Sequence, residues 1–309
     1  MKIGLLNCGG TITERYRDDG TIDRLRARDL AAWVGSTEWI THDVEPVDSS
    51  ELDFASIGRV RETMRQDRES DAFVLCCGTD ALEDVAYAAT LLLDRDRPVV
   101  VTGAAFPGGA AHSDGARNLT DAATLARALP RRTGPLVAFA GRIFDPAAIA
   151  KIWPQAHQPF GPETAIRGWI DADLATLTGQ DGGTESFADL DVADLDARVA
   201  IVTETFGPLV GFPDVTSLDG IVVAGKGAGG FSTGTRAILR QAASCVPVIL
   251  STRCLHGFRV NAEVAKYAYE DASALGLTVE GYEGLNASKA RIRLVAELGR
   301  AKARGERLA

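Results

Sequence analysis

Two threonines follow apolar segments closely in the sequence, at positions where a side-chain hydroxyl could act on a substrate. Thr11 lies in Gly9-Gly10-Thr11-Ile12, behind the apolar run 3–6, and Thr79 lies in Gly78-Thr79-Asp80, behind the run 72–75. A hydroxyl is a weak nucleophile until a neighbouring base removes its proton or it positions a water molecule. The paired glycines allow a backbone turn that side chains would block and would leave Thr11 exposed. These positions predict hydroxyl chemistry.

Asp80 and Lys151 are the groups that could serve these hydroxyls. Asp80 places a carboxylate beside Thr79, and Lys151 is one of only six lysines in the chain. A partly buried lysine has a lowered pKa, so that it could accept a proton from Thr79.

Each of these features also has an ordinary structural interpretation. The segment Gly9-Gly10-Thr11-Ile12 could be a tight turn or an anion-binding nest. Thr79 or Asp80 could cap the helix that follows them. Lys151 could be a solvated surface lysine. Taken one at a time, the motifs leave these alternatives open.

Apolar runs followed by glycine alternate with helical patterns along the first half of the chain. The runs rich in Val, Ile, Leu and Phe are expected to be buried strands, at 3–6, 72–75, 98–101 and 136–140. Helical spacing of apolar residues is found between them, at 54–66, 82–93 and 119–129. Alternation of this kind predicts an α/β fold with a doubly wound, mostly parallel sheet.

The composition changes around residues 181–196, which are rich in glycine and aspartate and are expected to form a linker. Residues 1–180 would then form a larger N-terminal catalytic α/β domain. Residues 197–309 would form a smaller C-terminal α/β domain, with strands at 199–203, 220–224 and 247–251 and helices near 235–243 and 288–301. In open α/β sheets, ligands bind beyond the carboxyl ends of the strands, where Thr11 and Thr79 are expected.

Charge and cysteine content narrow the function classes. The formal net charge is −9 over 309 residues, which argues against a partner that is nucleic acid or an acidic membrane surface. Five cysteines without metal-like spacing suggest reduced thiols in a cytoplasmic protein. Neither a signal peptide nor an apolar run of transmembrane length is recognised. The four histidines show no paired spacing, so neither a metal nor an organic cofactor is expected.

Taken together, the motifs resemble the bacterial asparaginase/glutaminase family over nearly the whole chain. The resemblance is carried by the following segments, in this order: Gly9-Gly10-Thr11-Ile12, Gly78-Thr79-Asp80, Pro98 to Ala104, Ser113-Asp114-Gly115 with Asn118-Leu119, Asp219-Gly220-Ile221-Val222, Ala262-Glu263-Val264 and Leu285 to Arg291. The set is far more specific than any single member.

The resemblance implies roles for individual residues. Thr11 matches the threonine that attacks the amide carbon, and Thr79, Asp80 and Lys151 match the second catalytic group. Asp80 also matches the carboxylate that holds the substrate α-amino group. The remaining matches are expected at the substrate: Asp48, Ser49 and Ser50, with Ser49 at the α-carboxylate, together with Gly78, Ala104 and Glu263.

Family likeness also implies assembly. Glu263 matches an acidic residue that reaches the site across a subunit interface, and a homodimer or homotetramer is therefore expected. The backbone N–H of Ala104 is expected to stabilise the oxyanion that develops on the amide. The segment Asp48-Ser49-Ser50 resembles the cytoplasmic branch of the family.

Several positions depart from the family pattern. Tyr16 is the only tyrosine in the loop after Thr11, and the family's activating tyrosine corresponds more nearly to Thr21. Tyr16 is retained as a catalytic candidate from a shifted position. Cys77 replaces a usual histidine, Ala81 replaces a threonine, and the segment up to Gly230 lacks the asparagines of the secreted branch. A pocket with fewer hydrogen-bonding partners discriminates differently between substrates.

The sequence thus predicts an amidohydrolase with a threonine nucleophile that acts on a small side-chain carboxamide. L-Asparagine, converted to L-aspartate and ammonia, is the expected substrate. A modified asparagine or another small amide is the alternative within the same chemistry. A non-catalytic amino-acid-binding or partner-binding protein of the same fold is the alternative outside it. An amide-hydrolysing subunit of an aminotransfer complex is a third reading, which lacks the support of an evident extra N-terminal domain.

Overall fold

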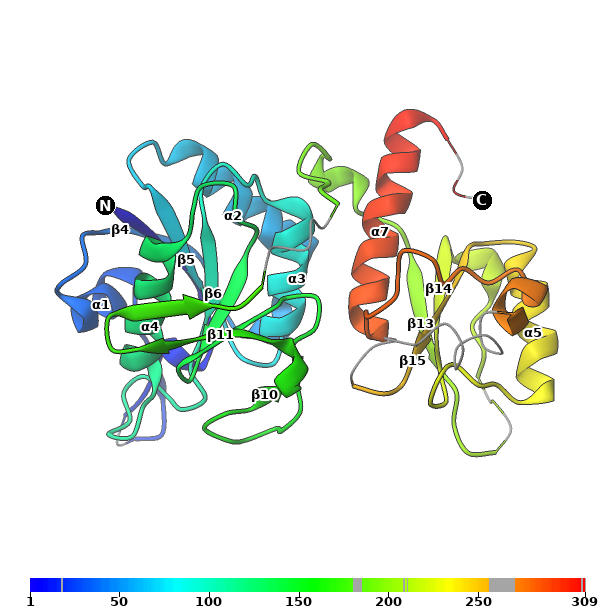
Figure 1. The fold of residues 1–309 in the computed structure, drawn as a ribbon, viewed down its shortest axis with the longest axis horizontal. Coiled ribbons are helices and arrows are strands. Elements are labelled where there is room, and N and C mark those ends of the chain that lie inside the picture. Colours follow the sequence, from blue (N-terminus) through cyan, green and yellow to red (C-terminus); the bar gives the residue numbers. More distant parts are fainter. Residues whose placement is uncertain are drawn as a thin grey trace. The chain divides into compact units, whose positions relative to one another are not determined.

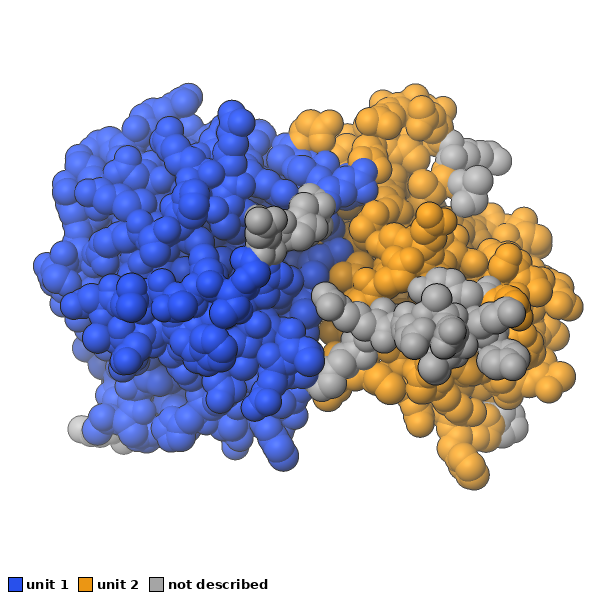
Figure 2. All heavy atoms as spheres, viewed as in Figure 1, with its two compact units in different colours: residues 1–188 blue, residues 189–309 orange. Residues whose placement is uncertain are grey.

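The computed structural model describes residues 1–17, 19–179, 185–207, 209, 211–255, 270–306 and 308. The chain divides into two compact units, residues 1–188 and 189–309 (Figure 2). The division falls inside the segment 181–196 that the composition marks as a linker. In the part of the chain that is described, no helix is both long and apolar enough to cross a membrane.

The first unit is built on an eight-stranded sheet with the strand order β12-β11-β8-β7-β6-β5-β1-β4. Its strands are β1 (Ile3–Gly9), β4 (Trp39–Val47), β5 (Ala72–Cys76), β6 (Val99–Thr102), β7 (Leu136–Phe139), β8 (Arg142–Phe144), β11 (Ile166–Asp171) and β12 (Leu174–Leu177). The five strands from β4 to β7 are parallel, and β8, β11 and β12 continue the sheet in antiparallel pairs. A mostly parallel sheet is thereby confirmed.

Helices cover both faces of this sheet, as expected for a doubly wound fold (Figure 1). The helices are α1 (Ala27–Ala31), α2 (Phe54–Gln66), α3 (Leu82–Leu92) and α4 (Gly115–Ala128). Alternate residues of β1 and β5, such as Ile3, Leu5 and Val74, join residues of α1 and α4 in one apolar cluster. The period of two is that of a strand buried on both faces.

The parallel strands follow the order β4-β1-β5-β6-β7. The chain therefore runs from β1 to β4 on one side of it, and then crosses to β5 on its other side. This is a topological switch point between β1 and β5. Loops that leave two such strands diverge to opposite faces of the sheet and leave a crevice at the carboxyl ends. The segment with Thr11 follows β1, and the segment with Thr79 follows β5, so both threonines lie at this point.

Two short pairs of strands stand apart from the main sheet. A hairpin is formed by β2 (Glu14–Tyr16) and β3 (Ile22–Arg24), directly after Thr11. A separate two-stranded sheet is formed by β9 (Ala150–Lys151) and β10 (Phe160–Gly161), which pairs Lys151 with Phe160. Lys151 therefore stands outside the main eight-stranded sheet.

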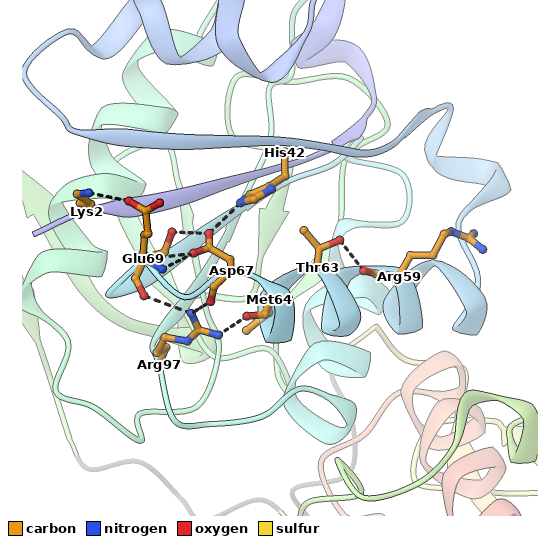
Figure 3. A network of polar contacts seen from close by, with 9 residues as sticks. Lys2, His42, Arg59, Thr63, Met64, Asp67, Glu69 and Arg97 are labelled. Carbon is orange, nitrogen blue, oxygen red and sulfur yellow. Dashed lines mark hydrogen bonds and ion pairs between the residues drawn. The ribbon is translucent and has the colours of Figure 1, made fainter.

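A buried aspartate ties together the loops at the opposite, amino-terminal edge of the sheet (Figure 3). The carboxylate of Asp67, which is only 2% exposed, accepts from the backbone N–H groups of Glu69 and Ser70 and from the Ser70 hydroxyl. It also lies 2.8 Å from Nε2 of His42. Arg97 donates to the carbonyls of Asp67 and Met64, which joins the loop before β6 to the loop before β5.

We expect the replacement Asp67→Asn to weaken the fold most at neutral pH. Burial alone would raise the pKa of Asp67, but hydrogen bonds from Ser70, His42 and Glu69 outweigh it and lower the pKa to about 2 from 3.8. A lowered carboxyl pKa contributes stability above the unfolded value and loses it as pH falls through the folded value. The difference corresponds to about 2 kcal/mol.

Urea unfolding of both proteins between pH 7 and pH 3 measures this effect. The difference in free energy of unfolding should stay near its full value down to about pH 5 and shrink below it. Asp94→Asn, which removes an exposed ion pair with Arg65, is the control and should cost less than about 1 kcal/mol. A difference for Asp67→Asn that does not change with pH would contradict the assignment.

The second unit has a three-stranded parallel sheet of β13 (Val199–Thr203), β14 (Gly220–Gly225) and β15 (Val248–Thr252). Among the described residues of this unit, helices are formed by α5 (Thr233–Ala243) and α7 (Ala287–Arg304). Leu239 of α5 joins Ile221 and Val223 in the core of this unit. A smaller α/β unit after residue 188 is thus observed.

Candidate active site

The loops after β1 and β5 meet backbone to backbone at the switch point. Gly10 has φ +80°, and a Cβ added to it would lie 2.2 Å from Cα of Gly78. Gly9 has φ +82°, and a Cβ there would lie 2.1 Å from the carbonyl oxygen of Val47, at the end of β4. Only glycine combines this left-handed backbone with so close an approach. The glycines therefore bring the segments with Thr11 and Thr79 together.

Ser49 joins the same place from the end of β4. It begins a short 3-10 helix, Ser49–Glu51, and is 5% exposed. A Cβ on Gly78 would lie 2.5 Å from Oγ of Ser49, so this hydroxyl lies against the backbone just before Thr79. Ser49, Gly78 and Thr11 thus come from three neighbouring strands of the sheet, β4, β5 and β1.

Asp48 and Ser50 are engaged with each other beside Ser49. The Asp48 carboxylate accepts from the backbone N–H of Ser50 at 3.0 Å and from its hydroxyl at 2.8 Å. The backbone and hydroxyl hydrogen bonds from Ser50 lower the pKa of Asp48. Asp48 therefore caps the turn that carries Ser49, and in this structure its carboxylate orients the turn.

Lys151 contacts Thr79 and Asp80 together. Its Nζ donates to Oγ1 of Thr79 at 2.9 Å and forms an ion pair with the Asp80 carboxylate. The Lys151 side chain is 14% exposed, whereas that of Asp80 is 76% exposed. The lysine is thus mostly buried and the carboxylate faces outward. The interpretation of Lys151 as a solvated surface lysine is wrong.

Neither Thr79 nor Asp80 caps α3, the helix that follows them. The residue at the start of α3 is Ala81, and no side-chain capping bond is formed there. The Thr79 hydroxyl instead receives the hydrogen bond from Lys151. Because the capping explanation fails, the cluster of Thr79, Asp80 and Lys151 is available for another role.

The loop after β6 covers Thr11. Ala104 is fully buried in the same cluster as Ile12, and the backbone N–H of Gly108 donates to the carbonyl of Thr11 at 3.2 Å. The Asp114 carboxylate holds this loop by accepting from the N–H groups of Ala105 and Phe106, both at 3.0 Å. The loop that carries Ala104 is therefore fixed beside Thr11.

Asn118 strengthens this loop from within α4. Its amide donates to the carbonyl of Gly103 and to Asp114, both at 2.9 Å, and accepts from the N–H of Ala140 at 3.0 Å. Asp114 and Asn118 are four residues apart on a helix, a spacing that places them on one face. That spacing is the sequence signal by which their shared structural role could have been recognised.

The contacts of Tyr16 in the structure do not support the catalytic role expected of it. Its side chain is 57% exposed on the hairpin, and its hydroxyl lies 3.5 Å from the carboxylate of Glu14. Within residues 1–17 and 19–179, this hydroxyl forms no hydrogen bond with Thr11 or Thr79. Glu263, which is expected to reach the site across a subunit interface, lies outside the described residues.

Cys77 occupies an apolar position beside the site. Its side chain is fully buried, and this burial raises the pKa of the thiol well above the ordinary value. A neutral buried thiol is a poor nucleophile. Cys77 is therefore a poor candidate for the nucleophile.

Two family models and several known proteins match this chain. The family model of the asparaginase N-terminal domain matches residues 2–176, and that of the glutaminase/asparaginase C-terminal domain matches residues 212–307. A probable L-asparaginase of Deinococcus radiodurans is 29% identical over 95% of this chain and 92% of its own length. An L-asparaginase of Thermococcus kodakarensis is 30% identical over 83% of this chain and 81% of its own length.

Two solved structures share the fold. The thermostable L-asparaginase from Thermococcus kodakarensis superposes with a TM-score of 0.80 and 23% identity, covering 97% of this chain and 93% of that one. A probable cytoplasmic L-asparaginase from Campylobacter jejuni has a TM-score of 0.76 and 22% identity, covering 97% and 99%. With both family models matched in order along the chain, this protein belongs to the asparaginase family and is an asparaginase-type amidohydrolase.

Proposed function

We propose that this protein hydrolyses L-asparagine to L-aspartate and ammonia, with Thr11 as the nucleophile. The observation that carries the proposal is the contact of Lys151 with Thr79 and Asp80, at the switch point where Thr11 also stands. The similar proteins from Deinococcus radiodurans and Thermococcus kodakarensis are a probable and a named L-asparaginase, which favours asparagine as the substrate.

In the first half of the reaction, Oγ1 of Thr11 attacks the side-chain amide carbon and a tetrahedral intermediate forms. The N–H of Ala104 stabilises its oxyanion, because a fixed donor needs no reorganisation as charge develops. The C–N bond then breaks, and the nitrogen takes up the proton that the Thr11 hydroxyl released on attack and leaves as ammonia. The product on the protein is an ester between Thr11 and the aspartyl group.

In the second half, a water molecule attacks this ester. Thr79 and Lys151 form the group that takes a proton from the water, while Asp80 holds the lysine and the substrate α-amino group. The ester bond breaks, aspartate is released, and Thr11 regains its proton. Water is the second substrate, and no oxidant or reductant is required for this balance.

Ser49 is proposed to bind the substrate α-carboxylate from its place against Gly78. We expect Ser49→Ala to raise KM about 10-fold or more while kcat changes less, because a hydrogen bond to a charged group is lost in the ground state as well. Steady-state kinetics with asparagine measure both constants. Ser217→Ala, in the second unit, is the control, and an unchanged KM for Ser49→Ala would remove this role.

Glu263 is proposed to complete the site from a neighbouring subunit, so the working protein would be a homodimer or homotetramer. Tyr16, which is exposed on the hairpin that follows Thr11, is proposed to activate the nucleophile. A cytoplasmic location is proposed from the reduced thiols and the family branch. Light scattering of the pure protein tests the assembly, and a monomer with full activity would contradict it.

Ammonia release from a panel of amides tests the function as a whole. Asparagine, glutamine, N-substituted asparagines and simple aliphatic amides are offered in parallel to pure protein. The proposal expects the highest kcat/KM for asparagine. Release from none of the amides would contradict the assignment as an active hydrolase, and preference for a substituted asparagine would replace the substrate.

A further inference from the structure

We infer that Glu83 is a positioning residue that holds Lys151 in reach of Thr79. The inference rests on the proposed function, since it concerns the group that serves the reaction there. Glu83 lies in the first turn of α3, four residues after Thr79. Its Oε1 accepts a hydrogen bond from the backbone N–H of Lys151 at 3.1 Å.

The lysine is thereby held at both ends by one short segment of chain. Its backbone is bound to Glu83, and its Nζ is bound to Thr79 at 2.9 Å and paired with Asp80. Thr79, Asp80 and Glu83 lie within five consecutive residues, at the turn that leads into α3. The backbone and the amino group of Lys151 are therefore bound to the same short segment, which fixes where the amino group lies.

Lys151 needs such a link because its own strand belongs to a separate sheet. The two-residue strand β9 pairs with β10, and neither of them is a member of the eight-stranded sheet that carries Thr11 and Thr79. The pairing of Lys151 with Phe160 sets its place relative to β10 only. The contact from Glu83 joins this small sheet directly to the helix that follows Thr79.

A purely structural role for Glu83 has different consequences. An acidic residue in the first turn of a helix interacts favourably with the helix dipole, and its removal would lower stability without affecting the chemistry. The positioning role depends instead on an oxygen acceptor at one place. The amide oxygen of glutamine can accept the same hydrogen bond, although it lacks the charge.

The experiment compares Glu83→Ala and Glu83→Gln with the wild type in ammonia release from asparagine. Glu83→Ala should lower kcat by about 10- to 100-fold with KM changed less than about 3-fold, because a misplaced catalytic group costs this much. Glu83→Gln should restore kcat to within about 3-fold of the wild type. Thermal unfolding of each variant is recorded alongside.

A double-mutant cycle separates action through Lys151 from any other effect. In a Lys151→Met background, Glu83→Ala should lower kcat by less than about 2-fold more, because the group that it positions is gone. An equal loss in both backgrounds would overturn the inference, as would full kcat in Glu83→Ala or failure of Glu83→Gln to restore it. If Glu83→Ala does not fold, Glu83→Asp takes its place, with an expected loss of about 3- to 10-fold that Glu83→Gln does not share.

Failure of this inference is distinct from failure of the proposed function. A wild type that releases no ammonia, or full activity in both Thr11→Ala and Lys151→Met, would overturn the function and the inference with it. An active wild type with inactive Thr11→Ala and Lys151→Met, but full kcat in Glu83→Ala, would overturn the inference alone.

Discussion

Thr11→Ala is expected to reduce ammonia release from asparagine by roughly 10³-fold or more, because loss of the nucleophile removes the covalent route. The side chain is half-buried at the switch point, and the backbone around it is fixed by Gly10 and Gly108. We therefore expect the fold to survive the loss of one hydroxyl and one methyl group. Steady-state ammonia release and thermal unfolding, measured on the same preparation, check both parts.

Thr120→Ala is the matched control for this change. Thr120 lies on α4 and its hydroxyl donates to the carbonyl of Ala116, so the same atoms are removed at a partly exposed helix position. The control should keep the activity of the wild type. Thr11→Ala with turnover close to that of the control would show that another group attacks the amide, and Thr79 would be the next candidate.

Lys151→Met is expected to reduce kcat by about 10²- to 10³-fold without unfolding the protein, as is typical when a group that transfers protons is lost. Methionine keeps most of the length and apolar volume of the lysine side chain. It removes the donor to Thr79 and the partner of Asp80, whose carboxylate is exposed enough to remain hydrated. Stability should therefore change little while the second half of the reaction slows.

Lys302→Met is the control for Lys151→Met. Lys302 forms an ion pair with Asp196 on an exposed part of the second unit. Exposed pairs contribute little to stability, so this variant should match the wild type in both assays. Unchanged kcat in Lys151→Met would contradict the role of Lys151 and, with it, the reason for a positioning residue at Glu83.

The sequence predicts strands β1, β5, β6 and β7 well because they are almost wholly buried, whereas the more exposed strands β4, β11 and β12 and the short strand β8 are not predicted. Helix 54–66 and strand 199–203 are found with the predicted ends. Helix α4 begins at Gly115 rather than at 119, because its first turn carries the polar residues around Asn118 that hold the loop after β6. The spacing of apolar residues does not reveal a helical turn that is made of polar residues.

The contacts of the site are less predictable than its location. The position of Thr11 and Thr79 after neighbouring strands follows from alternation of strands and helices, but their neighbours depend on long-range pairing. Lys151 reaches Thr79 across 72 residues of sequence, and Glu83 reaches Lys151 across 68. No local pattern carries such pairings. Glu83 could be seen only as one of two acidic residues at the start of a helix.

Identification of the covalent intermediate would show which residue attacks the amide. The protein is mixed with asparagine, quenched in acid within the first turnovers, digested and analysed by mass spectrometry. We expect an aspartyl group in ester linkage on Thr11, absent from Thr11→Ala treated in the same way. An aspartyl group on Thr79 or on any other residue, with Thr11 unmodified, would contradict it.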